Sequence, residues 1–361
     1  MNSEFNAIDF DELMDQALRL PDGDAKLALL EQAVRVADTR KDIEQGFKAR
    51  EEMVDLCTFK GYPLKALVAF SWLVGMKDKY PELLSGYSLL WKYMYISGHI
   101  TCFPEVNRIQ IENLLEDMKL RFAAEGYSDR TYYYYKMIVS IRMGDLDEGI
   151  EYYKLVQTME RDEMSNCQAC EQASHIGVQA ILGNDEGILH AAEPILAEKL
   201  KCDVSLETTI PLVLMTLLRL GLKEEADEWQ RKGYELIKGR RDYLFQLGLH
   251  ISYLTYTDPI KALEVFEENV VHSLNQEDPE IIMYFSAFAS KLFSRIEQEN
   301  IQFDVRLPLE HPCLHLSRNV AQLGKYYKNT ALDYAYKYDQ RNGNDYRSNE
   351  ILELCQFSEL K

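Results

Sequence analysis

The sequence predicts an all-α fold, a right-handed α-α superhelix of about seven helical hairpins that ends in a C-terminal capping helix. Small turn residues recur every 36 to 46 positions, at Gly23, Gly61, Gly98, Gly144, Gly183, Gly221 and Thr257. Four of them are followed five positions later by another small residue: Ala66, Gly149, Ala226 and Ala262. A unit of this length, built from two helices, is typical of superhelical repeat proteins.

Helix start signals divide the region before residue 300 into these hairpins. Asp258-Pro259 and Asp278-Pro279 each place a carboxylate before a proline at the first helical position. Asp145 and Glu148 have the spacing of a capping box. With the apolar periodicity, such signals predict helices over residues 10–20, 25–40, 43–59, 64–77, 82–96, 132–143 and 150–158, and a longer helix that begins at Pro104.

The pattern changes after residue 300. Two prolines and weak periodicity predict a loop over residues 301–312. Apolar residues then recur at three- and four-residue steps from Leu316 to Tyr338, and Asn342-Gly343 supplies a C-cap. We therefore expect a repeat domain over residues 1–300 and, over residues 301–361 of the same solenoid, a loop, a long capping helix and a short helix.

Three segments of the chain resemble the tetratricopeptide repeat (TPR) family. They are residues 142–153, 220–226 and 258–266, which carry the small and aromatic positions of the repeat. The resemblance covers roughly residues 9–300, with an interval near 38 residues instead of about 34. In such repeats a small residue such as Ala226 lets two helices approach closely. The resemblance implies a protein that binds a protein or peptide of unknown identity and catalyses nothing.

The resemblance also indicates which residues contact the partner. In TPR stacks the first helix of each pair lines the concave face, and counting back from the turn residues places five side chains there. These are Tyr134, Tyr135, Arg142, Arg219 and His250. Tyrosine and arginine suit such a surface because they combine contact area with hydrogen bonds. By fold alone the chain is also similar to bacterial peptide-pheromone receptors, so a peptide-signal receptor and an immunity-type inhibitor are alternatives.

The composition narrows the class of partner. With 40 basic and 59 acidic side chains the net charge is −19, which disfavours nucleic acids and anionic membranes. Residues 1–20 lack a signal-peptide pattern, and the most apolar run, residues 210–222, is shorter than the roughly 20 residues that a membrane span needs. Seven scattered cysteines do not indicate a disulfide framework, so the sequence predicts a cytoplasmic protein.

Two short motifs support another class of function, a metal-binding protein or thiol enzyme. Cys167-Gln-Ala-Cys170 is a CxxC, although no second CxxC follows it. His311-Pro-Cys313-Leu-His315 brings three metal-binding side chain types into five residues without an obvious fourth ligand. No GxSxG, HExxH, P-loop or dinucleotide motif is present. The prediction is a protein without cofactor or metal, and these two motifs carry the alternative.

Overall fold

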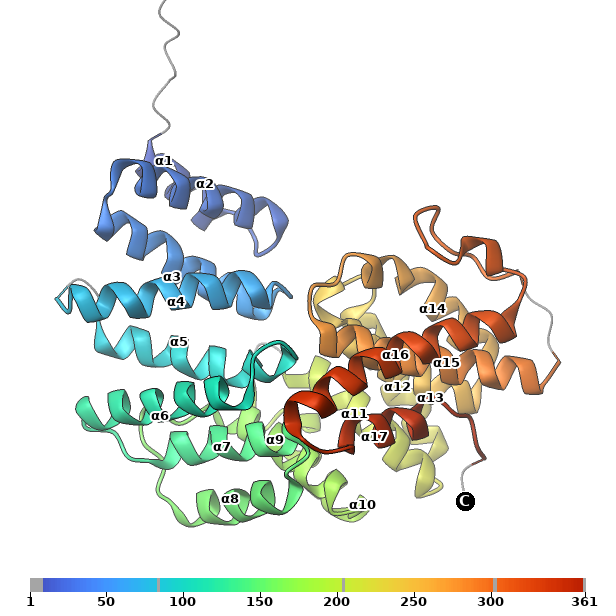
Figure 1. The fold of residues 1–361 in the computed structure, drawn as a ribbon. Coiled ribbons are helices and arrows are strands. Elements are labelled where there is room, and N and C mark those ends of the chain that lie inside the picture. The colour runs from blue at the N-terminus through green and yellow to red at the C-terminus, as the bar shows by residue number, and fades with distance from the viewer. Residues whose placement is uncertain (1–8, 83–84, 203–204, 301–303, 360–361) are drawn as a thin grey trace, which may run out of the picture. The chain divides into compact units, whose positions relative to one another are not determined.

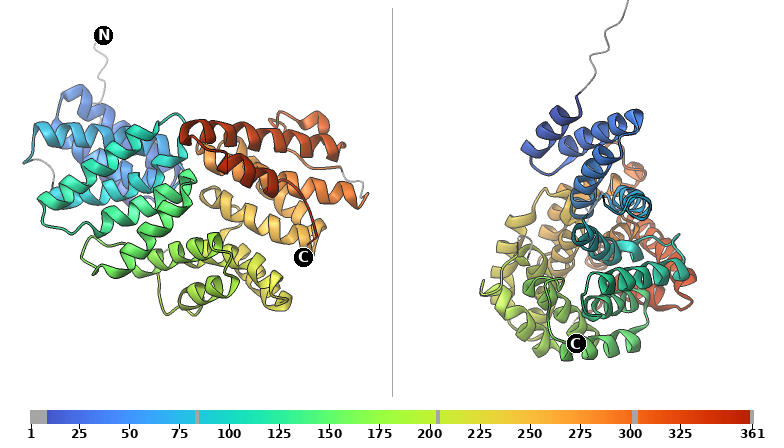
Figure 2. Two further views of the ribbon diagram at one scale, coloured as in Figure 1. Left: turned by 60° about the horizontal axis from the view of Figure 1, so that its bottom comes forward. Right: turned by 90° about the vertical axis from the view of Figure 1, so that its left-hand side faces the viewer.

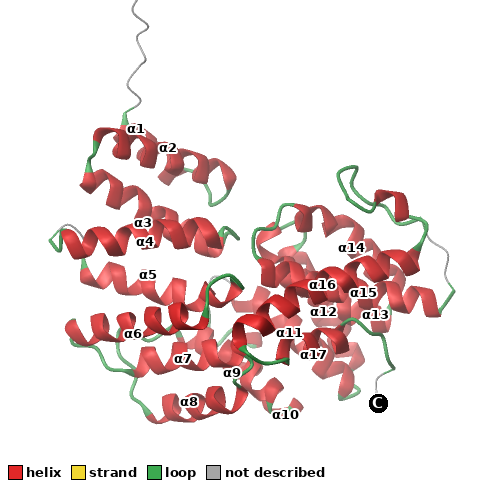
Figure 3. Ribbon diagram, in the orientation of Figure 1, coloured by secondary structure: helices red, strands yellow, loops and turns green. Residues whose placement is uncertain are grey.

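The structure is a computed structural model that describes residues 9–82, 85–202, 205–300 and 304–359. Every regular element in these ranges is a helix and none is a strand (Figure 3), which confirms the predicted all-α fold. No helix in these ranges combines the length and the apolar character that crossing a bilayer requires. The helices labelled in Figure 1 are α1 (Phe10–Arg19), α2 (Asp24–Arg40), α3 (Ile43–Phe59), α4 (Pro63–Lys79), α5 (Gly86–His99), α6 (Arg108–Ala124), α7 (Arg130–Met143), α8 (Leu146–Thr158), α9 (Gln168–Ile181), α10 (Asp185–Leu196), α11 (Ser205–Arg219), α12 (Lys223–Ile237), α13 (Leu244–Thr257), α14 (Pro259–Leu274), α15 (Pro279–Gln298), α16 (Val320–Asn342) and α17 (Tyr346–Leu354).

Most helices that follow one another along the chain pack against each other, and the ribbons in Figure 2 give two further views of their arrangement. The chain forms two compact units, one from the described parts of residues 1–101 and 109–135, the other from residues 102–108 and those after 135. In the first unit α1 packs on α2, α2 on α3 and α3 on α4. In the second, α9, α11, α13 and α15 lie against one another in order, and α10, α12 and α14 each pack on the helix before them. Each unit is thus built from stacked hairpins.

The repeat that the sequence predicts is visible as side-chain contacts between equivalent helices of neighbouring hairpins. Hydrogen bonds and ion pairs join residues that are 34 to 39 positions apart in the chain. The pairs are Glu31–Lys65, Glu51–Ser88, Asp55–Lys92, Tyr234–Glu268 and Ser252–Lys291. Such contacts between nearest neighbours are what holds a repeat stack together.

Several predicted helix ends have the expected geometry. The Asp258 carboxylate accepts a hydrogen bond from the Lys261 backbone N–H at 3.0 Å, and Asp278 accepts one from the Glu280 backbone N–H at 2.8 Å. Gly343 ends α16 in the left-handed conformation, with φ of 77°. Glycine adopts this conformation without the steric cost that other residues incur. The same conformation occurs at the turn residues Gly61, Gly144, Gly183 and Gly221.

Three local predictions are wrong. Helix α6 begins at Arg108 and not at Pro104, because a 3-10 helix over Ile100–Cys102 and further turns precede it. Gly98 is not a turn residue, since it lies inside α5. The Asp145 side chain does not cap α8. It accepts a hydrogen bond from the Arg108 guanidinium at 2.7 Å instead, so the charge pair between hairpins replaces the local cap.

The C-terminal region has the predicted long helix. Residues 304–313 contain no α-helix, which agrees with the predicted loop, and residues 301–303 of that loop lie outside the described residues. Helix α16 packs along α15, and α17 follows it. The Tyr338 hydroxyl on α16 donates a hydrogen bond to the Cys102 carbonyl at 2.6 Å, within the second unit. Beyond ending the stack, α16 therefore anchors a segment more than 200 positions earlier.

The small residues of the repeat lie where paired helices meet. Ala66, Ala226 and Ala262 are at most 1% exposed. Phe70 and Phe266 are also buried and fill the space beside them. Because interiors are close-packed, these positions are part of the scaffold and leave no room for larger side chains.

Candidate functional site

Three of the predicted partner-contacting residues lie in the interior. Tyr134 and Tyr135 on α7 are 4% and 5% exposed, and their rings pack edge to face with centroids 5.4 Å apart. His250 on α13 is 0% exposed, and neither ring nitrogen has a hydrogen-bond partner among the described residues. Burial lowers the pKa of His250 to about 3, so its ring is neutral near pH 7. In this structure none of the three offers a surface for a partner to contact.

The two predicted arginines are more accessible and already make contacts. Arg219 is exposed at the end of α11, and its Nη2 and Nε donate to the Asp185 carboxylate at 2.5 and 3.1 Å. These hydrogen bonds lower the pKa of Asp185. Arg142 is half-buried on α7, and its backbone carbonyl accepts a hydrogen bond from Arg347 Nη2 at 2.9 Å. A role for Arg142 and Arg219 in partner binding stays a prediction.

A row of aromatic side chains on α5 has the exposure that a binding face needs. Tyr87, Trp91 and Tyr95 recur at four-residue spacing, so they share one side of the helix. The ring centroids of successive members are 6.3 Å apart. Tyr87 is 47% exposed and the other two are partly exposed, whereas Leu89 and Leu90 on the other sides of α5 are buried. The outward side of α5 is therefore aromatic.

Helix α3 adds a fourth ring to this row. Phe59, the last residue of α3, is 52% exposed, and its ring centroid lies 5.0 Å from that of Tyr95 in an edge-on contact. The ion pair between Asp55 on α3 and Lys92 on α5 holds the two helices together beside these rings. We call this surface the α3–α5 aromatic face; it consists of Phe59, Tyr87, Trp91 and Tyr95.

Carboxylates border the α3–α5 aromatic face. Glu51, Glu52 and Asp55 lie on α3, all partly exposed. Glu51 accepts a hydrogen bond from the Ser88 hydroxyl and Asp55 pairs with Lys92. Burial and the nearby Asp55 charge raise the pKa of Glu52. The region thus combines aromatic rings with three carboxylates, and Lys26 and Lys92 lie close enough to offset part of their charge.

The sequence carried a signal for this face that counting from the turn residues did not use. Tyr87, Trp91 and Tyr95 have the four-residue spacing of one helix side. The concave positions were placed by counting back from turn glycines, and Gly98 is not a turn. The five counted positions lie on α7, α11 and α13, and none lies on α3 or α5.

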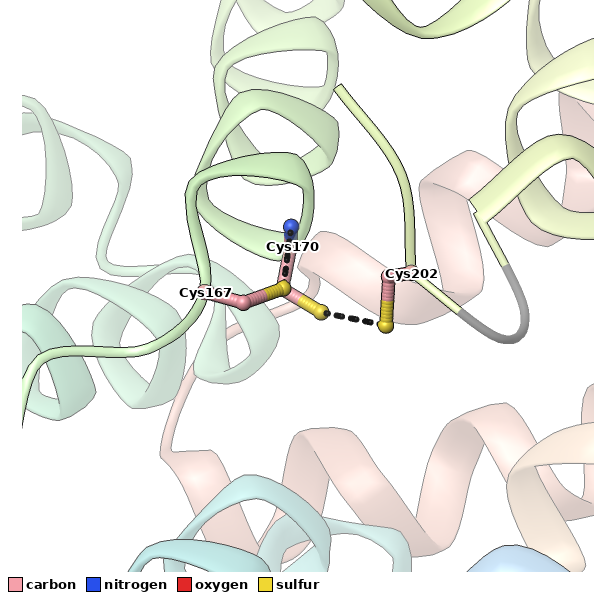
Figure 4. A group of neighbouring side chains, drawn as sticks. All are labelled: Cys167, Cys170 and Cys202. Atoms are coloured by element: carbon pink, nitrogen blue, oxygen red, sulfur yellow. Dashed lines mark hydrogen bonds between the residues drawn. The ribbon is translucent and has the colours of Figure 1, made fainter. Parts of the chain in front are cut away.

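A cluster of three thiols forms a second candidate site (Figure 4). Cys167 lies at the N-terminus of α9, where its Sγ accepts a hydrogen bond from the Cys170 backbone N–H at 3.3 Å. Cys202 comes from the segment between α10 and α11, and its Sγ is 3.8 Å from Cys170 Sγ. All three Sγ atoms lie within 4.8 Å of one another. Burial, reinforced by the two neighbouring thiols, raises the pKa of Cys170. The predicted CxxC is thus joined by a third thiol that its sequence position does not indicate.

The second predicted metal motif does not converge in this way. His311 is buried, its Nε2 lies 2.9 Å from the Tyr327 hydroxyl, and its Nδ1 accepts a hydrogen bond from the Cys313 backbone N–H at 3.1 Å. Burial lowers the pKa of His311 and raises that of Cys313. His315 is exposed. Among the described residues, the side chains of this motif do not form a group whose ligand atoms can reach one ion.

Comparison with known proteins adds no relative. No family model matches the chain, and no curated protein sequence matches it. The TPR resemblance therefore stays a prediction from sequence, and the α3–α5 aromatic face and the thiol cluster are the two features of the structure that bear on function.

Proposed function

We propose that the protein is a TPR-like, non-catalytic binding protein of the cytoplasm, and that it holds a basic peptide segment of a partner on the α3–α5 aromatic face. The observation that carries this proposal is the row of four aromatic rings on two first helices, of which Phe59 and Tyr87 are exposed and Trp91 and Tyr95 are partly exposed. Contiguous exposed apolar groups on a soluble protein mark interaction surfaces more often than chance. The cytoplasmic location is supported by the seven scattered cysteines, whose pattern does not indicate a disulfide framework.

The spacing of the rings supports an extended peptide. The Tyr87, Trp91 and Tyr95 rings follow one another at 6.3 Å. In an extended chain, side chains on the same face recur every two residues, or about 6.6 Å. Alternate side chains of a bound segment can therefore rest on successive rings without a change in backbone conformation.

The charge of the region supports a basic partner. Arginine and lysine are attracted to aromatic faces, most strongly to tryptophan. Glu51 and Glu52 border the rings beside the Asp55–Lys92 ion pair, and the whole chain has a net charge of −19. Such a field attracts cationic segments over a distance and repels acidic ones.

A peptide array tests this proposal. Purified protein is applied to random peptides, and the peptides that bind are re-measured with Trp91→Ala, Tyr87→Ala and Tyr336→Ala variants. Tyr336 is the matched control, since it is a tyrosine on α16 with 51% exposure. We expect enrichment of arginine and lysine at alternate positions, and about a 30-fold loss of affinity with Trp91→Ala, the effect of a hot-spot residue. Tyr336→Ala should bind as the wild type does.

Two results would contradict the proposal. One is selection of acidic peptides or of none, under low salt where electrostatic attraction is strongest. The other is equal loss of binding in Trp91→Ala and Tyr336→Ala, because the binding would then not depend on the α3–α5 aromatic face.

A further inference from the structure

Three of the seven cysteines differ from the others in where they lie. Four are buried in the interior, as is usual for cysteines that pack as small apolar side chains. These four are Cys57, Cys102, Cys313 and Cys355. Cys167 is exposed, and Cys170 and Cys202 are partly exposed, yet among the described residues these three converge. Apolar packing does not account for three thiols that meet where solvent has access.

The sulfur positions match a tetrahedral thiolate site. A zinc–sulfur bond is about 2.3 Å long, so two sulfurs on one tetrahedral zinc ion are about 3.8 Å apart. The Cys170 and Cys202 Sγ atoms are 3.8 Å apart. Cys167 Sγ lies within 4.8 Å of both, so a small rotation of its side chain completes the arrangement.

Hydrogen bonds around the thiols hold the three residues in place. The Cys170 backbone N–H donates to Cys167 Sγ, and the N-terminus of α9 favours negative charge on that sulfur. The hydroxyl of Ser205, the first residue of α11, accepts a hydrogen bond from the Cys202 backbone N–H at 3.2 Å and donates one to the Cys202 carbonyl at 3.0 Å. Hydrogen bonds of this kind orient the ligands of metal sites.

We propose that Cys167, Cys170 and Cys202 bind one zinc ion, with water or a small exogenous ligand in the fourth position. Thiolates select zinc over magnesium and calcium, which prefer oxygen ligands. Each thiol releases its proton to solvent as its zinc–sulfur bond forms, so one Zn²⁺ displaces three protons and no oxidant or reductant is needed. The site uses no residue of the α3–α5 aromatic face and is independent of peptide binding.

The zinc ion has a structural consequence in the second unit. It joins the start of α9 to the segment before α11, and so closes the α9–α10 hairpin with a bond between its two ends. A ligand that binds the folded hairpin and not the open one stabilises it. Zinc therefore slows hydrogen exchange of the α9 and α10 amides.

Metal titration of the full chain tests this proposal. Reduced protein is freed of metal with a chelator and titrated with Zn²⁺ against a chromophoric competitor, and with Co²⁺ to record thiolate charge-transfer and tetrahedral absorption bands. The variants are Cys202→Ser and Cys167→Ser, with Cys313→Ser as control because it belongs to the other predicted metal motif. Circular dichroism confirms that each variant is folded.

The expected result is one zinc ion per chain, bound at least about 100-fold more weakly by Cys202→Ser, since even the loss of an outer hydrogen-bond partner costs 10–100-fold. Cys313→Ser should bind as the wild type does. The proposal is overturned if folded Cys202→Ser retains the affinity and the cobalt spectrum, if the wild type takes up cuprous ion but not zinc, or if protein from a reducing lysate contains a disulfide between two of these cysteines.

Discussion

Helices α5 and α7 are both first helices of their hairpins, and both are rich in tyrosine, but they place their aromatic rings differently. On α5 three of the four rings, those of Tyr87, Trp91 and Tyr95, recur every four residues and share the outward side of the helix, whereas Tyr93 is buried. On α7 the run Tyr132 to Tyr135 is consecutive, so its members point in all directions, and three of the four are buried. The difference shows that spacing along a helix, and not the number of aromatic residues, decides whether they form a binding surface.

The largest expected effect is a difference in protein stability between a tyrosine variant on α7 and one on α5. Tyr135→Ala on α7 removes a 5%-exposed ring, and truncation of a buried aromatic side chain lowers the free energy of unfolding by about 3–5 kcal/mol. Tyr87→Ala on α5 removes a half-exposed ring and should change it by less than about 1 kcal/mol. Guanidinium unfolding of the two variants beside the wild type measures both. Equal destabilisation would mean that Tyr87 is part of the core and not of a free surface.

A buried residue on another helix, His250 on α13, makes the free energy of unfolding depend on pH. Like α5 and α7, α13 is the first helix of its hairpin. Folding holds this ring neutral with a pKa of about 3, whereas the unfolded chain takes up a proton near its ordinary value of 6.5. The unfolded state therefore binds more protons between these values, and the contribution of His250 to stability is present above pH 6.5 and lost as the pH falls toward 3. Between pH 7 and pH 5 this amounts to about 2 kcal/mol.

The variant His250→Leu provides the measurement of this effect. When the pH falls from 7 to 5, the wild type should lose about 2 kcal/mol more of its free energy of unfolding than the variant does, because leucine does not titrate. At pH 7 the variant should be at least as stable, since it removes a buried polar ring without hydrogen-bond partners among the described residues. Parallel pH curves for the two proteins would show that His250 has access to water.

The smallest effect concerns Arg219, the exposed member of the predicted contact residues. Its ion pair with Asp185 is on the surface, and such pairs contribute about 0–1 kcal/mol. Arg219→Ala should therefore change the unfolding midpoint little and leave the binding of array-selected basic peptides unchanged. If peptide affinity falls more in Arg219→Ala than in Trp91→Ala, the face that binds partners is the one first predicted from the TPR resemblance.

The sequence was sufficient for the helical architecture because its signals are local. A carboxylate before a proline, as at Asp258 and Asp278, and a glycine after a periodic segment, as at Gly343, act within one turn of helix. The helix over residues 43–59 was predicted with the observed ends. The sequence did not predict a helix end correctly where the capping residue instead contacts another hairpin. Asp145 pairs with Arg108 instead of capping α8, and no local pattern reports that choice.

The candidate sites depended on contacts that sequence spacing does not contain. Cys202 joins Cys167 and Cys170 because α9 and α10 form a hairpin that returns the chain to its start, 32 positions after Cys170. His311 and Cys313 are only two positions apart, yet a hydrogen bond between the imidazole and the Cys313 backbone occupies the ring nitrogen. Proximity in sequence therefore did not indicate which motif converges: the side chains of the His311–His315 motif do not meet, whereas Cys167 and Cys170 meet a third thiol from a distant segment.

Photo-crosslinking tests the central claim, that the α3–α5 aromatic face is the binding surface. A basic peptide from the array, carrying a photoreactive group at one alternate position, is irradiated with the full chain, and the attached residues are identified by mass spectrometry. We predict adducts on Phe59, Tyr87, Trp91 or Tyr95, lost when excess unlabelled peptide is present. Adducts confined to other helices, such as α16 around Tyr336, would contradict the claim.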